Sequence, residues 1–126
     1  MPQKFNYIDF SNSITSLPRK SASLSKDRYI SNEFMELEWE GIWTKTWLFA
    51  GIESDLAEVG DFFVYDIGRE SIVITRNEEM KISAFYNVCQ HRGNKIVTIE
   101  SGSFNKVSCP YHGWTYSLNG KLEHVP

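Results

Sequence analysis

Two short segments of the sequence each place a histidine two or three positions after a cysteine. Cys89 is followed by His91, and Cys109 by His112. Each segment comes after a run of residues typical of a β-strand, so both are expected at the tips of hairpins. Two such tips standing side by side would present two sulfur and two nitrogen ligands to one metal centre. Because the chain has no other cysteine, its fold has to bring these two segments together for such a centre to form.

Two cysteines and two histidines are the ligand set of a Rieske-type [2Fe-2S] cluster, in which the cysteines bind one iron and the histidines the other. Two ferric ions, two sulfides and two thiolates sum formally to zero charge, whereas four thiolates leave the cluster anionic. An electron is therefore added more easily, at about -150 to +300 mV against about -400 mV for four-cysteine plant-type clusters. We predict that the domain transfers single electrons and that its cluster ligands are Cys89, His91, Cys109 and His112.

Residues beside these ligands fit the same role. Gly93 and Gly113 lack a Cβ, so backbone N–H groups near them can approach cluster sulfur. Tyr111 and Trp114 are expected to form an apolar shell, whose hydrogen bonds and solvent access tune the reduction potential. Arg92 is expected either to support the first loop or to be solvated.

The N-terminal part of the chain differs from the rest. Residues 1–30 include a serine-rich stretch with few large aliphatic side chains, so we expect an arm without a core of its own. Apolar residues then recur at helical spacing and predict a helix over 32–46, with Ser31 or Asn32 as its N-cap. Gly41 lies inside this helix and is expected to weaken its continuity.

The sequence after Trp47 is typical of β-structure. Turn signals separate runs of apolar and β-branched residues. These runs predict strands at 62–67, 72–75, 82–88, 96–99 and around Val107. One broad apolar face, with the tryptophans at 39, 43 and 47, is expected to pack the helix onto the strands.

Asn119-Gly120 is the strongest turn signal, because this pair suits a type I′ turn joining strands at 114–118 and 121–125. Short strands at this spacing predict a mainly β fold, a small antiparallel barrel or sandwich that carries the metal-binding hairpin loops and the N-terminal helical arm. We assign residues 31–126 to this domain.

The segments Asn87-Val-Cys-Gln-His-Arg-Gly93 and Cys109-Pro-Tyr-His-Gly-Trp114 resemble the Rieske domain of ring-hydroxylating and quaternary-amine oxygenase α subunits. The likeness extends over residues 29–126, and Trp47-Leu-Phe-Ala-Gly51 and Gly60-Asp-Phe62 resemble the family's lead-in to the barrel. The resemblance implies a subunit that relays electrons from a ferredoxin or flavin reductase to a mononuclear non-haem iron. It also implies O2-dependent hydroxylation, as in aromatic hydrocarbon catabolism.

In the resembled family the second iron is held by two histidines and a carboxylate in a catalytic domain. Once His91 and His112 are used, only His124 remains, so we expect the Fe(II) site to be absent from this sequence. The resemblance implies that the catalytic domain lies outside it, in the same or a neighbouring subunit of a homo-oligomer of trimeric type. By resemblance, His112 faces a carboxylate of that neighbouring domain. We expect this chain alone to have no oxygenase activity.

Two other functions fit the same residues. A stand-alone Rieske ferredoxin would carry electrons without a catalytic domain, although such ferredoxins generally lack the lead-in segment. A zinc-stabilised interaction module could also use two cysteines and two histidines. Zinc fingers usually pair like ligands, however, whereas both segments here are mixed.

Composition limits the remaining classes. The formal net charge is -3, and no basic run is interleaved with aromatic residues, so we expect no nucleic-acid partner. No apolar stretch approaches the ~18 residues of a membrane span, and the first residues lack the apolar core of a secretory signal. Two cysteines are too few for a disulfide framework. We therefore expect a cytoplasmic protein that does not enter a membrane.

Overall fold

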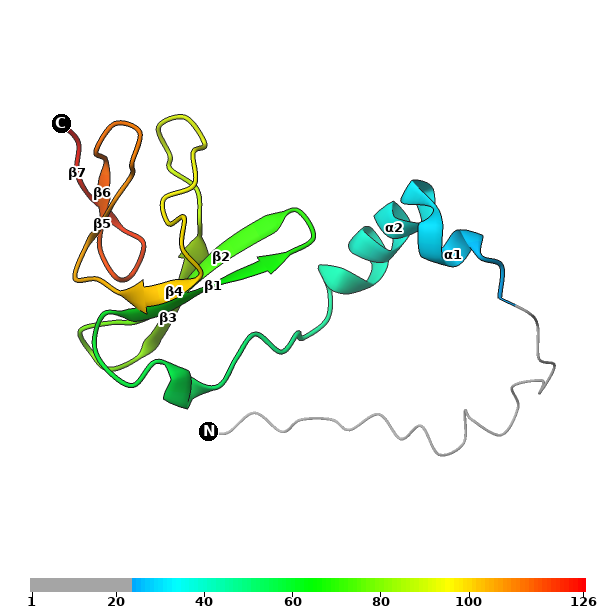
Figure 1. Ribbon diagram of the computed structural model, residues 1–126, viewed down its shortest axis with the longest axis horizontal. Coiled ribbons are helices and arrows are strands. Elements are labelled where there is room, and N and C mark those ends of the chain that lie inside the picture. Colours follow the sequence, from blue (N-terminus) through cyan, green and yellow to red (C-terminus); the bar gives the residue numbers. More distant parts are fainter. Residues whose placement is uncertain (1–23) are drawn as a thin grey trace, which may run out of the picture. The chain divides into compact units, whose positions relative to one another are not determined.

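The computed structural model describes residues 24–126 (Figure 1). Most of the predicted arm, residues 1–30, lies outside this range. The described residues form two compact units, which divide after Ile42. Along the described part of the chain, none of the helices combines the length and the apolar character needed to cross a membrane.

The first unit is helical. A short helix, α1 (Asp27–Ile30), is followed by α2 (Asn32–Glu38). The hydroxyl of Ser31 accepts a hydrogen bond from the N–H of Phe34 at 3.3 Å, so Ser31 is the N-cap, one of the two residues predicted for that place.

The single helix predicted over 32–46 changes type after Glu38 and ends three residues early, at Trp43. The α-helical hydrogen bonding ends at Glu38, and a π-helix continues from Trp39 to Trp43. Gly41 lies in the middle of this π-helix, where the low helix propensity of glycine weakens the α-helical alternative.

Near the start of the second unit, exposed and half-buried side chains alternate over residues 47–50. Leu48 and Ala50 are half-buried, whereas Phe49 is 79% exposed and Trp47 is fully exposed. Trp47 therefore lies outside the helix whose apolar face was predicted to include it. Helical spacing places Trp47 on one face with the preceding tryptophans, but the helix has ended before this residue.

The main sheet of the second unit has the strand order β3-β2-β1-β4 and is antiparallel throughout. Its strands are β1 (Asp61–Ile67), β2 (Glu70–Arg76), β3 (Ile82–Tyr86) and β4 (Ser101–Ser103). The strand predicted over 96–99 does not form. Ile96 and Val97 are instead buried in the core, so their apolar character reflects burial without strand pairing.

A smaller antiparallel sheet follows, with the order β5-β6-β7. It comprises β5 (Val107–Ser108), β6 (Thr115–Tyr116) and β7 (Leu122–His124). The strands predicted over 114–118 and 121–125 are thus shorter than expected.

The predicted type I′ turn at Asn119-Gly120 is also wrong. The N–H of Gly120 donates to the carbonyl of Ser117 at 3.0 Å, which makes Leu118 and Asn119 the central residues. Of these residues only Gly120 has a positive φ, +73°. The turn is displaced because Leu118 is buried and its carbonyl accepts a 2.6 Å hydrogen bond from the Thr75 hydroxyl on β2.

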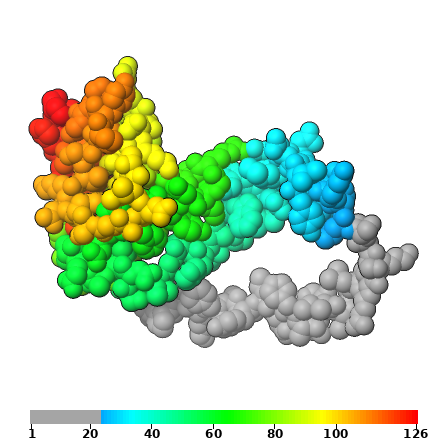
Figure 2. All heavy atoms as spheres, viewed as in Figure 1, coloured from blue at the N-terminus to red at the C-terminus, as the bar shows by residue number. Residues whose placement is uncertain are grey.

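The core of the second unit joins both sheets. Phe62 and Val73 of the main sheet cluster with Tyr116 of the small sheet and with both cysteines. Across the sheets, the side chain of Asn119 accepts hydrogen bonds from Asn77 and Ser83 at 2.9 and 2.7 Å. The result is a two-sheet antiparallel body from which two loops project side by side (Figures 1 and 2).

Candidate metal centre

Loop 1, residues 88–96, is closed by two backbone hydrogen bonds. The N–H of Cys89 donates to the carbonyl of Asn94 at 2.8 Å, and the N–H of Gly93 donates to the carbonyl of Cys89 at 2.9 Å. Gly93 has φ +72°, and a Cβ there would meet no atom within 4 Å. Glycine is therefore required at this position by the left-handed backbone and not by lack of space.

Loop 2, residues 109–114, repeats the pattern. The N–H of Cys109 donates to the carbonyl of Trp114 at 2.8 Å, and the N–H of Gly113 donates to the carbonyl of Cys109 at 3.0 Å. Gly113 has φ +73°. Each cysteine thus opens the same kind of closed turn, with a left-handed glycine four residues later and a histidine between them.

The sulfur atoms lie inside the domain. Cys89 and Cys109 are buried, and both are free thiols. Burial alone raises the pKa of the Cys89 thiol, but hydrogen bonds to its sulfur outweigh burial and lower the pKa below its ordinary value. The donors are the Tyr116 hydroxyl at 3.3 Å, the backbone N–H groups of His91 and Arg92, and the Cys109 thiol. Such an environment favours the thiolate, the form that binds metals.

The imidazole rings lie at the loop tips and are exposed. The ring centroids of His91 and His112 are 4.7 Å apart, with an angle of 70° between the rings. Trp114 stacks on His91 at 5.0 Å, and Tyr111 lies against His112 at 3.8 Å. The aromatic residues that we expected to form a shell around the ligands therefore contact the two histidines directly.

This arrangement fits a [2Fe-2S] unit. Two buried sulfurs and two exposed imidazoles form separate pairs, as required when one iron takes thiolates and the other takes imidazoles. In residues 24–126, no group of three or more His, Cys, Asp or Glu side chains is arranged to hold a single metal ion. A tetrahedral zinc site needs four ligands around one point, which is a different arrangement from two separate pairs.

Comparison with known families decides the assignment. The model of the Rieske [2Fe-2S] domain matches residues 46–126. The chain belongs to the Rieske [2Fe-2S] domain family. The predicted resemblance and the predicted cluster are thereby confirmed.

Curated relatives of this Rieske domain are oxygenase subunits. It is 37% identical over 102 residues to the glycine betaine monooxygenase oxygenase subunit of Pseudomonas aeruginosa, covering 81% of this chain and 24% of the relative. It is 38% identical over 98 residues to the biphenyl dioxygenase subunit alpha of Paraburkholderia xenovorans, covering 78% and 21%. The chain thus spans about a quarter of the length of these relatives. They favour the oxygenase interpretation over the stand-alone ferredoxin.

Solved structures agree on the fold. The Rieske domain superimposes on the apo form of the quaternary ammonium Rieske monooxygenase CntA with a TM-score of 0.75 and 38% identity, covering 82% of this chain and 30% of the other. For naphthalene 1,2-dioxygenase from Rhodococcus sp. the TM-score is 0.72 with 38% identity, covering 75% and 21%. The predicted mainly β antiparallel fold class is confirmed.

Two residues of the Rieske domain close to the ligands were given no role in the sequence analysis, where Asn87 appears only as part of the resembled segment. Tyr116 is 1% exposed, and its hydroxyl accepts from the N–H of Gln90 at 3.0 Å while it donates to Cys89. Asn87 is 3% exposed and bonds across the base of loop 1. Neither role has a local signature, because each depends on partners that only the folded chain brings near.

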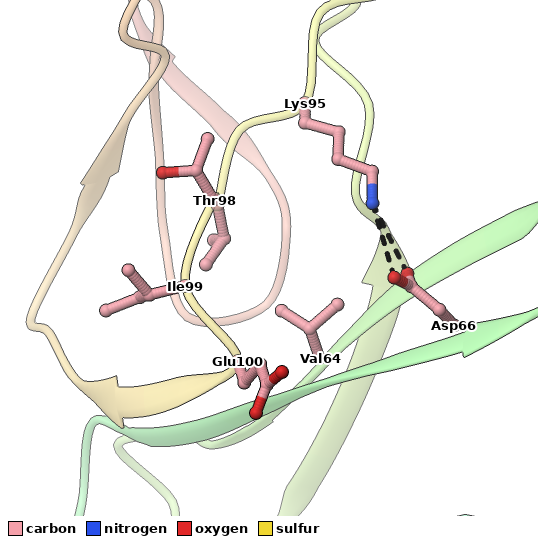
Figure 3. Close-up of a pocket in the computed structure, with 7 residues that line it drawn as sticks. Val64, Asp66, Lys95, Thr98, Ile99 and Glu100 are labelled. Atoms are coloured by element: carbon pink, nitrogen blue, oxygen red, sulfur yellow. Dashed lines mark hydrogen bonds and ion pairs between the residues drawn. The ribbon is translucent and has the colours of Figure 1, made fainter.

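A separate surface pocket of about 380 Å³ lies between β1 and the segment after loop 1 (Figure 3). Its rim carries an exposed ion pair between Lys95 and Asp66 at 3.3 Å. Hydrogen bonding from the Ser71 hydroxyl, together with Lys95, lowers the pKa of Asp66. The lining residues include neither Cys nor His, so this pocket is distinct from the candidate metal centre.

Proposed function

We propose that Cys89 and Cys109 bind one iron of a [2Fe-2S] cluster, that His91 and His112 bind the other, and that the domain passes single electrons within an oxygenase. The observation that carries the proposal is the pair of loops with one hydrogen-bond pattern, which hold two buried thiols and two imidazoles 4.7 Å apart. When bound, the cluster supplies a one-electron carrier whose mixed ligands keep its potential above that of four-cysteine clusters.

The residues around the proposed cluster have separate roles. The buried thiols exclude water from the sulfur side, and the Tyr116 hydroxyl together with loop N–H groups stabilises negative charge there. His91 and His112 are exposed, so electrons enter and leave at the loop tips through the imidazoles. Trp114 and Tyr111 restrict the positions of these rings.

The oxygenase reaction belongs to a longer protein. Curated relatives are about four to five times as long as the matched region, and the sequence contains only three histidines. The mononuclear Fe(II), held by two histidines and a carboxylate, is therefore assigned to a catalytic domain outside this chain. That domain would carry out O2-dependent hydroxylation of a quaternary amine or an aromatic compound, the kinds of molecule named for the relatives.

The proposed partners follow from the exposed ring pair. A ferredoxin or flavin reductase would deliver electrons at the loop tips, and a catalytic domain of a neighbouring subunit would receive them beside His112. One structurally similar protein is a quaternary ammonium Rieske monooxygenase, and its structure gives insight into electron transfer between subunits of that enzyme. We place the assembly in the cytoplasm as a homo-oligomer of trimeric type.

Metal analysis of the aerobically purified chain tests the cluster. We expect a red-brown protein with iron and labile sulfide in equal amounts, and a Rieske-type electron paramagnetic resonance (EPR) signal after dithionite reduction. The EPR signal should be lost in each of three ligand variants, Cys109→Ser, His91→Ala and His112→Ala. His124→Ala is the matched control, because His124 is exposed on β7. Zinc in place of iron, or a normal spectrum from Cys109→Ser, would refute the assignment.

A further inference from the structure

The two cluster loops are anchored differently. Loop 2 is the tip of the β5–β6 hairpin, and the paired residues Ser108 and Thr115 flank its base. Loop 1 leaves the end of β3, but the chain then runs on to β4, which pairs with β1 and not with β3. The strand ladder that holds loop 2 therefore has no equivalent at loop 1.

The side chain of Asn87 takes the place of that ladder. Its Oδ1 accepts hydrogen bonds from the N–H groups of Ile96 and Val97 at 3.0 and 2.8 Å. Its Nδ2 donates to the carbonyl of Val97 at 2.8 Å and to the hydroxyl of Ser71 at 3.3 Å. Because Asn87 is 3% exposed, water does not compete with these bonds, and one carboxamide ties both ends of loop 1 to β2.

We infer that Asn87 is a positioning residue for Cys89 and His91. It touches neither ligand and acts through the backbone of loop 1. By fixing that loop, it keeps Cys89 within reach of the Tyr116 hydroxyl and keeps the ring of His91 4.7 Å from that of His112. The inference rests on the proposed binding of the cluster by these residues.

The other contact at this end of the loop is much weaker. Lys95 pairs with Asp66 at 3.3 Å across the pocket rim (Figure 3), but the side chains of both residues are more than half exposed. Exposed pairs of this kind contribute little to stability. The buried carboxamide is therefore a stronger restraint on this end of loop 1 than the exposed ion pair.

Asn77 provides a matched control within the same domain. Its Oδ1 accepts from the N–H groups of Glu79 and Lys81 at 3.0 and 2.9 Å, and its Nδ2 donates to Ser83 and Asn119 at 3.0 and 2.9 Å. It is 6% exposed. It repeats the network of Asn87 at the opposite end of the β2–β3 pair, in the turn between these strands.

The test compares Asn87→Ala and Asn77→Ala in the cluster-loaded chain. Leaving two buried N–H groups without acceptors should make opening of loop 1 roughly tenfold or more frequent. We expect Asn87→Ala to release its cluster to a chelator about that much faster and to broaden the EPR lines. Hydrogen exchange should accelerate in residues 88–96 and not in 109–114. Asn77→Ala should lower the unfolding temperature but leave cluster release and the EPR lines unchanged.

Asn87→Asp is the conservative variant, and it keeps the test decisive should the alanine variant fail to fold. Its carboxylate retains the acceptor for both N–H groups but loses the donor to Val97 and Ser71, so release should fall between the wild-type and alanine rates. Suppose that the Asn87 variants match Asn77→Ala in the rate of cluster release, the EPR line width and hydrogen exchange in residues 88–96. That result would overturn this inference but not the proposed function. A wild-type chain without iron and sulfide would overturn the proposed function, and this inference with it.

Discussion

Removing the Tyr116 hydroxyl is the most informative single change near the proposed cluster. Tyr116→Phe deletes the donor that lies 3.3 Å from the Cys89 sulfur and the acceptor that lies 3.0 Å from the Gln90 N–H. The ring, which is 1% exposed, stays in the core. The variant therefore separates hydrogen bonding from packing.

The size of the effect follows from the charge on sulfur. A hydrogen bond to a charged group contributes ~1.5–3 kcal/mol, and only the difference between the reduced and oxidised cluster alters the potential. We take the hydrogen bond to be about 1 kcal/mol stronger in the reduced cluster, which carries more electron density on sulfur. Converted for one electron, its loss lowers the reduction potential of Tyr116→Phe by about 40 mV. Loss of the Gln90 contact should also cost about 1 kcal/mol of unfolding free energy.

The assay is a redox titration followed by EPR. Burial, and then the hydrogen bond to Cys89, raise the pKa of Tyr116. Its proton therefore stays in place, and the difference between variant and wild type should be constant below about pH 10. Tyr111→Phe is the control, since Tyr111 is 57% exposed and contacts His112 through its ring. An unchanged or higher potential in an intact Tyr116→Phe cluster would refute the reasoning.

Three further outcomes are expected. Gly93→Ala should lower the unfolding free energy by ~1–2 kcal/mol in urea titrations, because φ is +72° there, whereas Gly41→Ala in the π-helix should not lower it. The folded-state pKa of Asp66 is lowered, so its stabilising contribution is present above the unfolded pKa of about 3.9 and disappears as pH falls through the folded pKa. The difference in Tm between wild type and Asp66→Asn should therefore be constant near neutral pH and vanish in acid. Finally, the chain incubated with reductant, candidate substrates and ¹⁸O2 should incorporate no label into product, and cluster-dependent labelling would show an oxygen-activating site within it.

Features of this protein that depend on local spacing are predictable from the order of its residues. The two cysteine–histidine segments identify all four proposed ligands, and a glycine four residues after each cysteine marks the turn that closes each loop. Runs of β-branched residues located β1, β2 and β3 to within a few residues, because strand preference and burial act on neighbouring positions. Ser31 was recognisable as one of two possible N-caps for the same reason.

Contacts between groups far apart in the chain depend on how the sheets pack. The Tyr116 hydroxyl donates to a cysteine sulfur 27 residues away in the chain. The Thr75 hydroxyl donates to the carbonyl of Leu118, 43 residues away, and this bond fixes the position of the turn. The segment at 96–99 has the composition of a strand, yet Asn87 binds the N–H groups of Ile96 and Val97, and the side chains of these two residues lie in the core. A buried polar group must find a hydrogen-bond partner among the groups that packing brings near it. These hydrogen bonds therefore form only after the sheets have assembled, and so does the order that they impose on the loops.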